Sequence, residues 1–189
     1  MSPLVSSVNQ ILSLLTITGQ AIIVLVLINN LRFTKSSEIK ADFVNQLINK
    51  NVVLLSFIIA LIATLGSLFY SEIAGFEPCK LCWFQRILMY PQVVLLGLAL
   101  FRKDKNIIIY TLWLSLIGAA IALYHYLLQI GVAPNLSCSV TGYSAHCSQR
   151  FVMNFGYITI PMMAFTAFSM VSVLFLIKKR GVVEPRSAQ

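Results

Sequence analysis

The sequence has few charged residues. Aspartate, glutamate, lysine and arginine make up 11% of its 189 residues, whereas hydrophobic residues make up 58% and the mean hydropathy is +0.85. A soluble globular domain carries about 25% charged residues, because its surface must face water. The shortage of charge therefore excludes an ordinary soluble domain. Internal repeats and low-complexity tracts are lacking too, so nothing indicates a repeat protein.

What the sequence has instead is five long apolar segments. Each can cross about 30 Å of hydrocarbon at about 1.5 Å of rise per residue, and in lipid only a helix satisfies all its backbone groups internally. We expect an all-α fold, a polytopic membrane helix bundle with a four-helix core and one additional N-terminal transmembrane helix. The expected membrane segments are 8–31, 51–71, 84–101, 107–130 and 157–177. The expected division is an N-terminal helix and cytoplasmic linker at 1–50, the core at 51–177 and a cytoplasmic tail at 178–189.

The net charge of +8 is distributed unevenly along the chain. Of the 14 basic residues, 11 lie in the first polar loop, in the short loop at 102–106 and in the tail. This positive-inside bias predicts an N-terminus outside the cytoplasm, a cytoplasmic tail and four cysteines on the outer side. The basic residues are thereby explained as topology determinants. We expect membrane lipid around the helices and no nucleic-acid partner.

A basic stretch before the first apolar segment is missing, and so is a small-residue cleavage site after it. This favours a membrane helix with its N-terminus outside over a cleaved signal peptide. Gln20 within that helix predicts a helix–helix hydrogen bond. In the first polar loop, apolar residues at helical spacing predict a short amphipathic helix on the cytoplasmic face. These residues are Ile39, Phe43, Leu47 and Ile48.

Cysteine is scarce as well, with four residues in two pairs. Cys79 and Cys82 form a Cys-x-x-Cys pair at the lip of an apolar segment, after Pro78, a residue suited to the entry of a helix. Unpaired N–H groups and the helix dipole stabilise a thiolate at such a place. Cys138 and Cys147 occupy a second polar loop on the same side of the membrane. Two such pairs at one membrane surface indicate electron transfer through thiols.

Two titratable residues are expected in the membrane near the first pair. Arg86 follows Cys82 by four residues and shares its helix face. A buried arginine needs a partner, and a thiolate or the carbonyl oxygen of a quinone would serve; the alternative is an arginine that snorkels to the surface. His125 is expected at the same depth on a neighbouring helix, where it could hydrogen-bond a quinone carbonyl or pass its proton. Its alternative is a satisfied core or interfacial histidine.

Other features leave alternatives open. Pro91 is either a tolerated membrane proline or the origin of a widened cleft beside the dithiol. His146, adjacent to Cys147, is favoured as a solvated residue. Four cysteines could also hold zinc, but the spacing of Cys138 and Cys147 is unusual for a zinc half-site, and an outer compartment favours disulfides. We therefore expect no metal site.

The segment PCKLCWFQRILMYP, from Pro78 to Pro91, resembles the signature of the DsbB/BdbC family of disulfide-bond formation membrane proteins. The run Tyr124-His125-Tyr126 and the run from Ile158 to Pro161 are similar to that family as well. The close spacing of the loop cysteines resembles the BdbC branch. The resemblance covers residues 51–177, and the N-terminal helix departs from the usual four-helix pattern.

The resemblance implies a quinone-dependent protein-disulfide oxidoreductase in the bacterial inner membrane. A soluble thioredoxin-fold thiol oxidase, DsbA- or BdbD-like, would pass electrons to a redox disulfide Cys138–Cys147. The electrons would then pass to a second redox disulfide, Cys79–Cys82. From Cys82 they would pass to a quinone near Arg86, either ubiquinone or menaquinone. Gln85 matches the motif too, as polar support in the quinone site or as a residue that solvates the helix end.

Two other classes compete with this reading. Vitamin K epoxide reductase-like enzymes use similar parts, but there the loop pair precedes the Cys-x-x-Cys pair along the chain, and here the order is reversed. A non-enzymatic membrane assembly or transport protein with structural disulfides is the other rival. Apart from Pro91, nothing in the sequence resembles the broken helix of a transport site. Reduction of a quinone by thiols would separate these classes.

Overall fold

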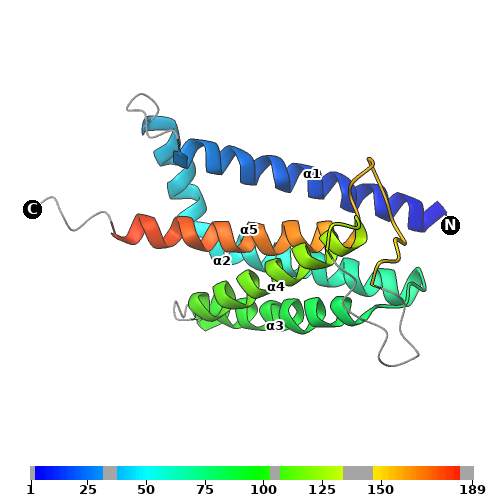
Figure 1. Ribbon diagram of the computed structural model, residues 1–189. Helices are drawn as coiled ribbons and strands as arrows, with labels where there is room; N and C mark the ends of the chain where they lie inside the picture. The colour runs from blue at the N-terminus through cyan, green and yellow to red at the C-terminus, as the bar shows by residue number, and fades with distance from the viewer. Residues whose placement is uncertain (1–2, 32–37, 103–106, 134–146, 184–189) are drawn as a thin grey trace, which may run out of the picture.

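The computed structural model describes residues 3–31, 38–102, 107–133 and 147–183. In these residues the chain forms five long helices and no strand, as Figure 1 shows. The helices are α1 (Pro3–Leu31), α2 (Glu38–Leu68), α3 (Lys80–Arg102), α4 (Ile107–Gln129) and α5 (Ile160–Val183), and α2 runs into a short π-helix, η1 (Phe69–Ile73). The expected all-α helix bundle is confirmed.

Every one of these helices contains a segment long and apolar enough to cross a membrane. The five segments are 18 to 26 residues long, and they are Pro3–Ile28, Asn51–Ile73, Lys80–Arg102, Ile107–Gln129 and Ile160–Ile177. Most boundaries lie within a few residues of those expected. The main differences are that α1 begins at Pro3 and α3 at Lys80. Polar and charged residues can form the first turn of a helix, and hydropathy alone does not detect them.

The amphipathic helix expected in the first polar loop is the first part of α2 and not a separate element. Residues 38–65 contain neither proline nor glycine, so nothing in this stretch ends a helix before the membrane segment. Figure 1 shows this first part turned away from the direction of the rest of α2. Residues 32–37, which precede it, lie outside the described part of the chain.

The core of the bundle lies between α2, α3, α4 and α5. It is built from buried apolar side chains of all four helices, among them Val52, Leu96, Leu112 and Phe168. α4 and α5 approach closely because Gly118 has no side chain and the ring of Phe168 lies where its Cβ would be. A buried hydrogen bond from Ser115 Oγ to Gln92 Oε1, at 2.9 Å, joins α4 to α3. The expected antiparallel pairing of α3 and α4 is confirmed.

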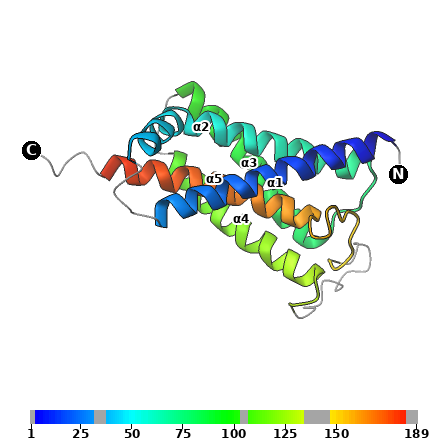
Figure 2. The ribbon, with the colours of Figure 1, turned by 90° about the horizontal axis from the view of Figure 1, so that it is seen from above.

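The additional helix α1 packs on α5, outside the four-helix core. Figure 2 shows it crossing α5 on the outer side of the bundle. Polar side chains attach it: Gln20 Nε2 donates to Thr166 Oγ1 at 3.2 Å, and Asn154 Nδ2 donates to Ser13 Oγ at 2.7 Å. The predicted helix–helix hydrogen bond of Gln20 is thereby confirmed.

One end of the bundle holds the start of α1 and the residues that precede α3 and α5 (Figure 1). The end of α5 lies at the opposite end. Residues 147–159 at the first end make an irregular loop. It contains an isolated bridge between Asn154 and Ile158, with Phe155 and Gly156 at φ of 51° and 81°. This end of the bundle carries Cys79, Cys82 and Cys147.

Candidate active site

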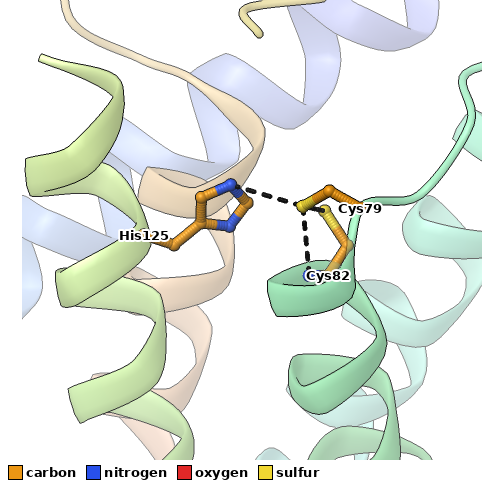
Figure 3. Close-up of side chains that lie close together, drawn as sticks. All are labelled: Cys79, Cys82 and His125. Atoms are coloured by element: carbon orange, nitrogen blue, oxygen red, sulfur yellow. Dashed lines mark hydrogen bonds between the residues drawn. The ribbon is translucent and has the colours of Figure 1, made fainter. Parts of the chain in front are cut away.

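The Cys-x-x-Cys pair caps the N-terminus of α3. Pro78 leads into Cys79, whose carbonyl oxygen accepts the first helical hydrogen bond from the Trp83 N–H at 3.1 Å. The Cys79 Sγ accepts the otherwise unpaired N–H of Cys82 at 3.4 Å, as an N-cap side chain does. The two Sγ atoms are 3.1 Å apart (Figure 3). Local helix-start chemistry therefore brings both sulfurs together.

His125 of α4 lies directly beside this pair, with its ring turned toward Cys79 (Figure 3). It is 1% exposed, and its Nε2 lies 3.6 Å from Cys79 Sγ. Its Nδ1 lies 3.0 Å from Gln85 Nε2, and its Nε2 lies 3.0 Å from the backbone oxygen of Cys147. The Gln85 amide donates and the Cys147 carbonyl accepts, so Nδ1 holds the lone pair and Nε2 carries the hydrogen.

Cys147 packs into the same place from the segment between α4 and α5. Cys79, Leu128 and Cys147 form one buried cluster, flanked by partly buried Leu81, Cys82, Tyr124 and Ala133. The structure thus brings together three of the four predicted cysteines. Cys138 and His146 lie outside the described residues. Hence the predicted pairing of Cys138 with Cys147 stays a prediction.

The segment after Cys147 is held by two residues that sequence reasoning did not assign to the site. Gln129 Nε2, at the end of α4, donates to the Gln149 backbone oxygen at 2.9 Å. Arg150 donates to the Gln129 backbone oxygen from both Nε, at 2.9 Å, and Nη2. The sequence does single out Arg150, because it is a basic residue in a loop predicted to lie outside the cytoplasm, where the positive-inside rule does not explain it. These bonds fix the loop beside the dithiol.

The environment of Cys79 disfavours its thiolate. The hydrogen bond with the Cys82 sulfur, followed by burial, raises the pKa of Cys79 from 9.0 to about 12. The hydrogen bond with His125 acts in the opposite direction and lowers this pKa, but it does not outweigh the other two. In the reduced pair Cys79 is therefore the protonated partner, and its thiol donates to the sulfur of Cys82.

Arg86 is directed toward α2 and not toward the loop. Its Nε donates to Ser67 Oγ at 3.0 Å, its Nη2 donates to the Ser67 backbone oxygen at 2.9 Å, and its guanidinium lies 5.3 Å from the centre of the Trp83 ring. Ser67 lies just before η1, where the helix widens. These contacts hold Arg86 inside the bundle, one turn below Cys82.

An apolar cavity of about 380 Å³ reaches the dithiol from within the bundle. Cys82, Gln85 and Arg86 line it, as does Glu77, and most of the remaining lining is apolar and comes from α1, α2, α3 and α5. Cys79, Pro91 and His125 are not among its lining residues. The cavity thus touches one cysteine of the pair. His125 meets its lining through Gln85, and its role toward a quinone stays a prediction.

The same residues could be considered as metal ligands. The donor atoms of Cys79, Cys82 and His125 all lie within 4.8 Å of one another, a spacing compatible with zinc. The His125 nitrogen that faces Cys79, however, is the one that donates to the Cys147 oxygen. A metal would have to displace that hydrogen and break that bond. The arrangement therefore favours a thiol–imidazole contact.

Comparison with known proteins gives a consistent result. A family model described as "Disulfide bond formation protein DsbB" matches residues 49–178. "Probable disulfide formation protein C" of Halalkalibacterium halodurans is 43% identical over 129 residues, which is 68% of this chain and 93% of the relative. "Disulfide bond formation protein C" of Bacillus subtilis is 43% identical over 129 residues, 66% of this chain and 89% of the relative. No solved structure matches.

Proposed function

Because this chain belongs to the DsbB family of disulfide bond formation proteins, we propose that it is a multi-pass membrane enzyme that reoxidises a soluble thioredoxin-fold thiol oxidase, DsbA- or BdbD-like, and passes the electrons to a membrane quinone. Membership of the family supports oxidoreductase chemistry in disulfide formation. The soluble partner, the quinone acceptor and the outer location of the cysteines are parts of the proposal.

The observation that carries this proposal is that both cysteines of the pair lie at the cluster that contains Cys147, whereas only Cys82 also reaches the cavity inside the bundle. Cys79 packs against Cys147, which comes from the outer loop. Cys82 lines the apolar cavity inside the bundle. A pair placed between a loop cysteine and a membrane cavity can take electrons on one side and release them on the other.

The first half of the reaction is thiol–disulfide exchange. A thiolate of the reduced partner attacks Cys138 in the Cys138–Cys147 disulfide, and Cys147 leaves as a thiolate. Cys147 then attacks Cys79 in the Cys79–Cys82 disulfide, and Cys82 leaves as a thiolate. The second thiol of the partner breaks the mixed disulfide with Cys138, which releases the oxidised partner.

The loop pair is then restored, because Cys138 attacks Cys147 and Cys79 leaves. The balance is one partner dithiol oxidised to a disulfide and the Cys79–Cys82 disulfide reduced to two thiols. Packing of Cys147 against Cys79 supports this order of attack. The low thiolate content of Cys79, whose pKa is raised to about 12, supports Cys82 as the cysteine that carries the negative charge in the reduced pair.

His125 is placed to serve the exchange between the two pairs. Its Nε2–H lies beside both the Cys147 oxygen and the Cys79 sulfur. When Cys79 leaves as a thiolate, this N–H can donate to it and stabilise its charge. A space of about 20 Å³ beside Cys79, His125 and Gln129 is large enough for one water molecule, which can supply the proton that the Cys79 thiolate takes up.

The cavity at Cys82 fits a quinone. Its volume of about 380 Å³ lies in the range of small-molecule sites, its walls are mainly apolar, and Cys82, Gln85 and Arg86 supply polar groups. When bound, a quinone supplies a sink for two electrons and two protons, which reoxidises the Cys79–Cys82 dithiol and gives a quinol. Arg86 and Gln85 would hold its carbonyl oxygen, and Arg86 would favour the negative charge that develops there. Ubiquinone and menaquinone both fit this description.

The proposal is tested with the purified protein in lipid. A reduced thioredoxin-fold oxidase is added as electron donor, and the loss of quinone absorbance is followed with the donor in excess. We expect one quinone reduced per partner disulfide formed. Cys82→Ser serves as the control that should abolish quinone reduction. Partner oxidation that continues at the wild-type rate without quinone would contradict the proposal.

A further inference from the structure

We propose that α1 is the wall of a binding channel for the isoprenoid tail of the quinone, so that this additional helix determines which quinones the enzyme accepts. The inference rests on the proposed function and deepens it. It concerns a part of the chain that lies outside residues 49–178, the range matched by the family model.

One face of α1 lines the cavity that ends at Cys82. Its lining residues recur at the spacing of a single helix face. They include Leu12, Leu15, Thr16, Gly19 and Ile22. From residue 12 to residue 22 the helix rises about 15 Å. The cavity therefore extends well beyond what a quinone ring at Arg86 would fill.

The shape and chemistry of this space suit an apolar chain joined to a polar ring. Cys82, Gln85 and Arg86 supply polar groups from α3. The α1 side supplies aliphatic residues and two threonines, whose hydroxyls already bond backbone oxygens of their own helix. An isoprenoid quinone has the same division, with a ring that accepts hydrogen bonds and a tail that does not.

Helix α1 is fixed in place as a wall. Near the dithiol end, Tyr70 of η1 donates from its hydroxyl to Asn9 Oδ1 at 2.9 Å. Further along, Gln20 bonds both Thr166 of α5 and the hydroxyl of Tyr157. Between these anchors a Cβ at Gly19 would lie 2.7 Å from Met170 Sδ, so the glycine allows α1 to approach α5 closely. The helix is thus attached on both sides of the lining residues.

Thr16 offers the sharpest test of the channel. It is 6% exposed and lines the cavity, and its hydroxyl bonds the Leu12 oxygen of its own helix at 2.8 Å, so replacing it breaks no bond between helices. Thr16→Phe places a ring in the channel. Leu14→Phe is the matched control, because Leu14 is 54% exposed and does not line the cavity.

The experiment uses the full chain in lipid and two quinones with the same head group, one without a side chain and one with a long isoprenoid chain. We expect Thr16→Phe to raise the apparent KM for the long-chain quinone about tenfold, because the ring occupies space that the tail would fill and the channel becomes overpacked when both are present. The KM for the quinone without a side chain should stay at its wild-type value. Leu14→Phe should change neither. If Thr16→Phe had the wild-type KM for the long-chain quinone as well, the proposal would be overturned.

If Thr16→Phe lost activity with both quinones, the loss could come from misfolding. Ile22→Phe would then be the variant that tests the channel. Ile22 lines the other end of the channel and is half exposed, so it has room for a larger side chain. A selective effect on the long-chain quinone supports the channel, and an equal loss with both quinones overturns it. Reduction of neither quinone by the wild-type protein overturns the proposed function and the channel together.

A second measurement identifies what fills the channel without relying on turnover. Lipids extracted from purified wild-type protein should contain quinone, and Thr16→Phe should retain several-fold less of it. Leu14→Phe should retain the wild-type amount. A phospholipid bound in place of quinone in all three proteins would overturn the proposal while leaving the thiol chemistry at Cys82 untouched.

Discussion

Nε2 of His125 lies 3.0 Å from the backbone oxygen of Cys147, so a residue in the middle of the bundle holds the loop cysteine against the dithiol. The same nitrogen lies 3.6 Å from Cys79 Sγ. A single buried side chain therefore contacts both Cys79 and Cys147. Its other ring nitrogen contacts Gln85, which lines the cavity, although His125 itself does not.

His125→Ala is expected to slow transfer between the cysteine pairs. Losing a buried hydrogen bond costs about 1–3 kcal/mol, which corresponds to a fall in turnover of about tenfold or more. Because His125 does not line the cavity, the KM for quinone should be unchanged. Steady-state kinetics, with the concentration of the partner and then of the quinone varied, would separate the effect on turnover from the effect on the KM for quinone. A raised quinone KM with normal turnover would instead support the role as a quinone ligand.

Tyr124→Phe is the control for that experiment. Tyr124 flanks the same cluster of Cys79 and Cys147, and within the described part of the chain its buried hydroxyl has no hydrogen-bond partner. Removing the hydroxyl should leave turnover within about twofold of wild type, because no bond between described residues is lost.

The loop pair is tested by trapping the mixed disulfide. In Cys147→Ser the cysteine that follows Cys138 in the exchange is missing, so a covalent complex of Cys138 with the partner oxidase should accumulate. Cys138→Ser should form no such complex. Non-reducing gels of the two variants with the partner would show this. A complex formed through Cys147 in Cys138→Ser would reverse the proposed order of the loop cysteines.

Arg86→Ala should weaken coupling to quinone and leave both disulfides able to form. A hydrogen bond to a charged group contributes about 1.5–3 kcal/mol, so the apparent KM for quinone should rise about tenfold to a hundredfold. Arg86→Lys should restore part of this, since an ammonium lacks the planar set of donors that bonds both Ser67 oxygens. Ser67→Ala should have a smaller effect, because the backbone oxygen remains. Wild-type kinetics in Arg86→Ala would show that the arginine has only a structural role.

The ionisation of Cys79 should follow its raised pKa. In the reduced protein, the thiolate absorbance that is lost when Cys79 is replaced by alanine should still be rising above pH 10, because the pKa of this thiol is about 12. Cys82→Ala removes the largest cause of the shift and should move the inflection to lower pH. His125→Ala removes the group that lowers the pKa and should have the opposite effect. A plateau near pH 9 in the wild type would contradict the assignment.

The same shift has a consequence for stability. A thiol whose pKa is higher in the folded than in the unfolded protein binds its proton more tightly when folded. Its contribution to the free energy of unfolding is therefore complete below the ordinary value of 9.0 and is lost as pH rises from there toward about 12. Thermal denaturation of the reduced protein should show this decline, and Cys79→Ala should lack it.

The topology is tested by labelling with a membrane-impermeant maleimide. The outer-loop thiols should react in intact cells after reduction. A cysteine introduced at Lys103, in the loop expected in the cytoplasm, should react only after permeabilisation. Labelling of that position from outside would overturn the sidedness predicted from the basic residues, and with it the outer location of the cysteines.

Much of the fold could be predicted because hydropathy directly reports which segments are long enough to cross lipid. The Cys79-x-x-Cys82 pair could be predicted at a helix start because Pro78 and the helix dipole act locally. The contact between His125 and Gln85 could not, since it depends on how α3 and α4 are rotated against each other. Hydropathy alone does not indicate the direction in which the His125 ring points.

The partner of Arg86 is the clearest example of this limit. The sequence argument required a partner for a buried guanidinium and considered a thiolate or a quinone. The structure supplies Ser67, a single serine in an apolar run just before η1. A lone serine carries no pattern that marks it as a ligand, and a π-helix has no simple sequence signal. Similarly, the bonds between α1 and Asn154 join residues more than a hundred positions apart.

Cys79 and Cys147 expose 3% and 2% of their surface. A small thiol dissolved in the surrounding medium cannot attack a sulfur that it cannot reach, so these two atoms are insulated from the general pool of low-molecular-weight reductants. Only a protein that displaces or engages the outer loop gains access to them. If the proposed function holds, burial would prevent small thiols from passing electrons to the quinone, and the selectivity of the enzyme would arise from burial as much as from reduction potential.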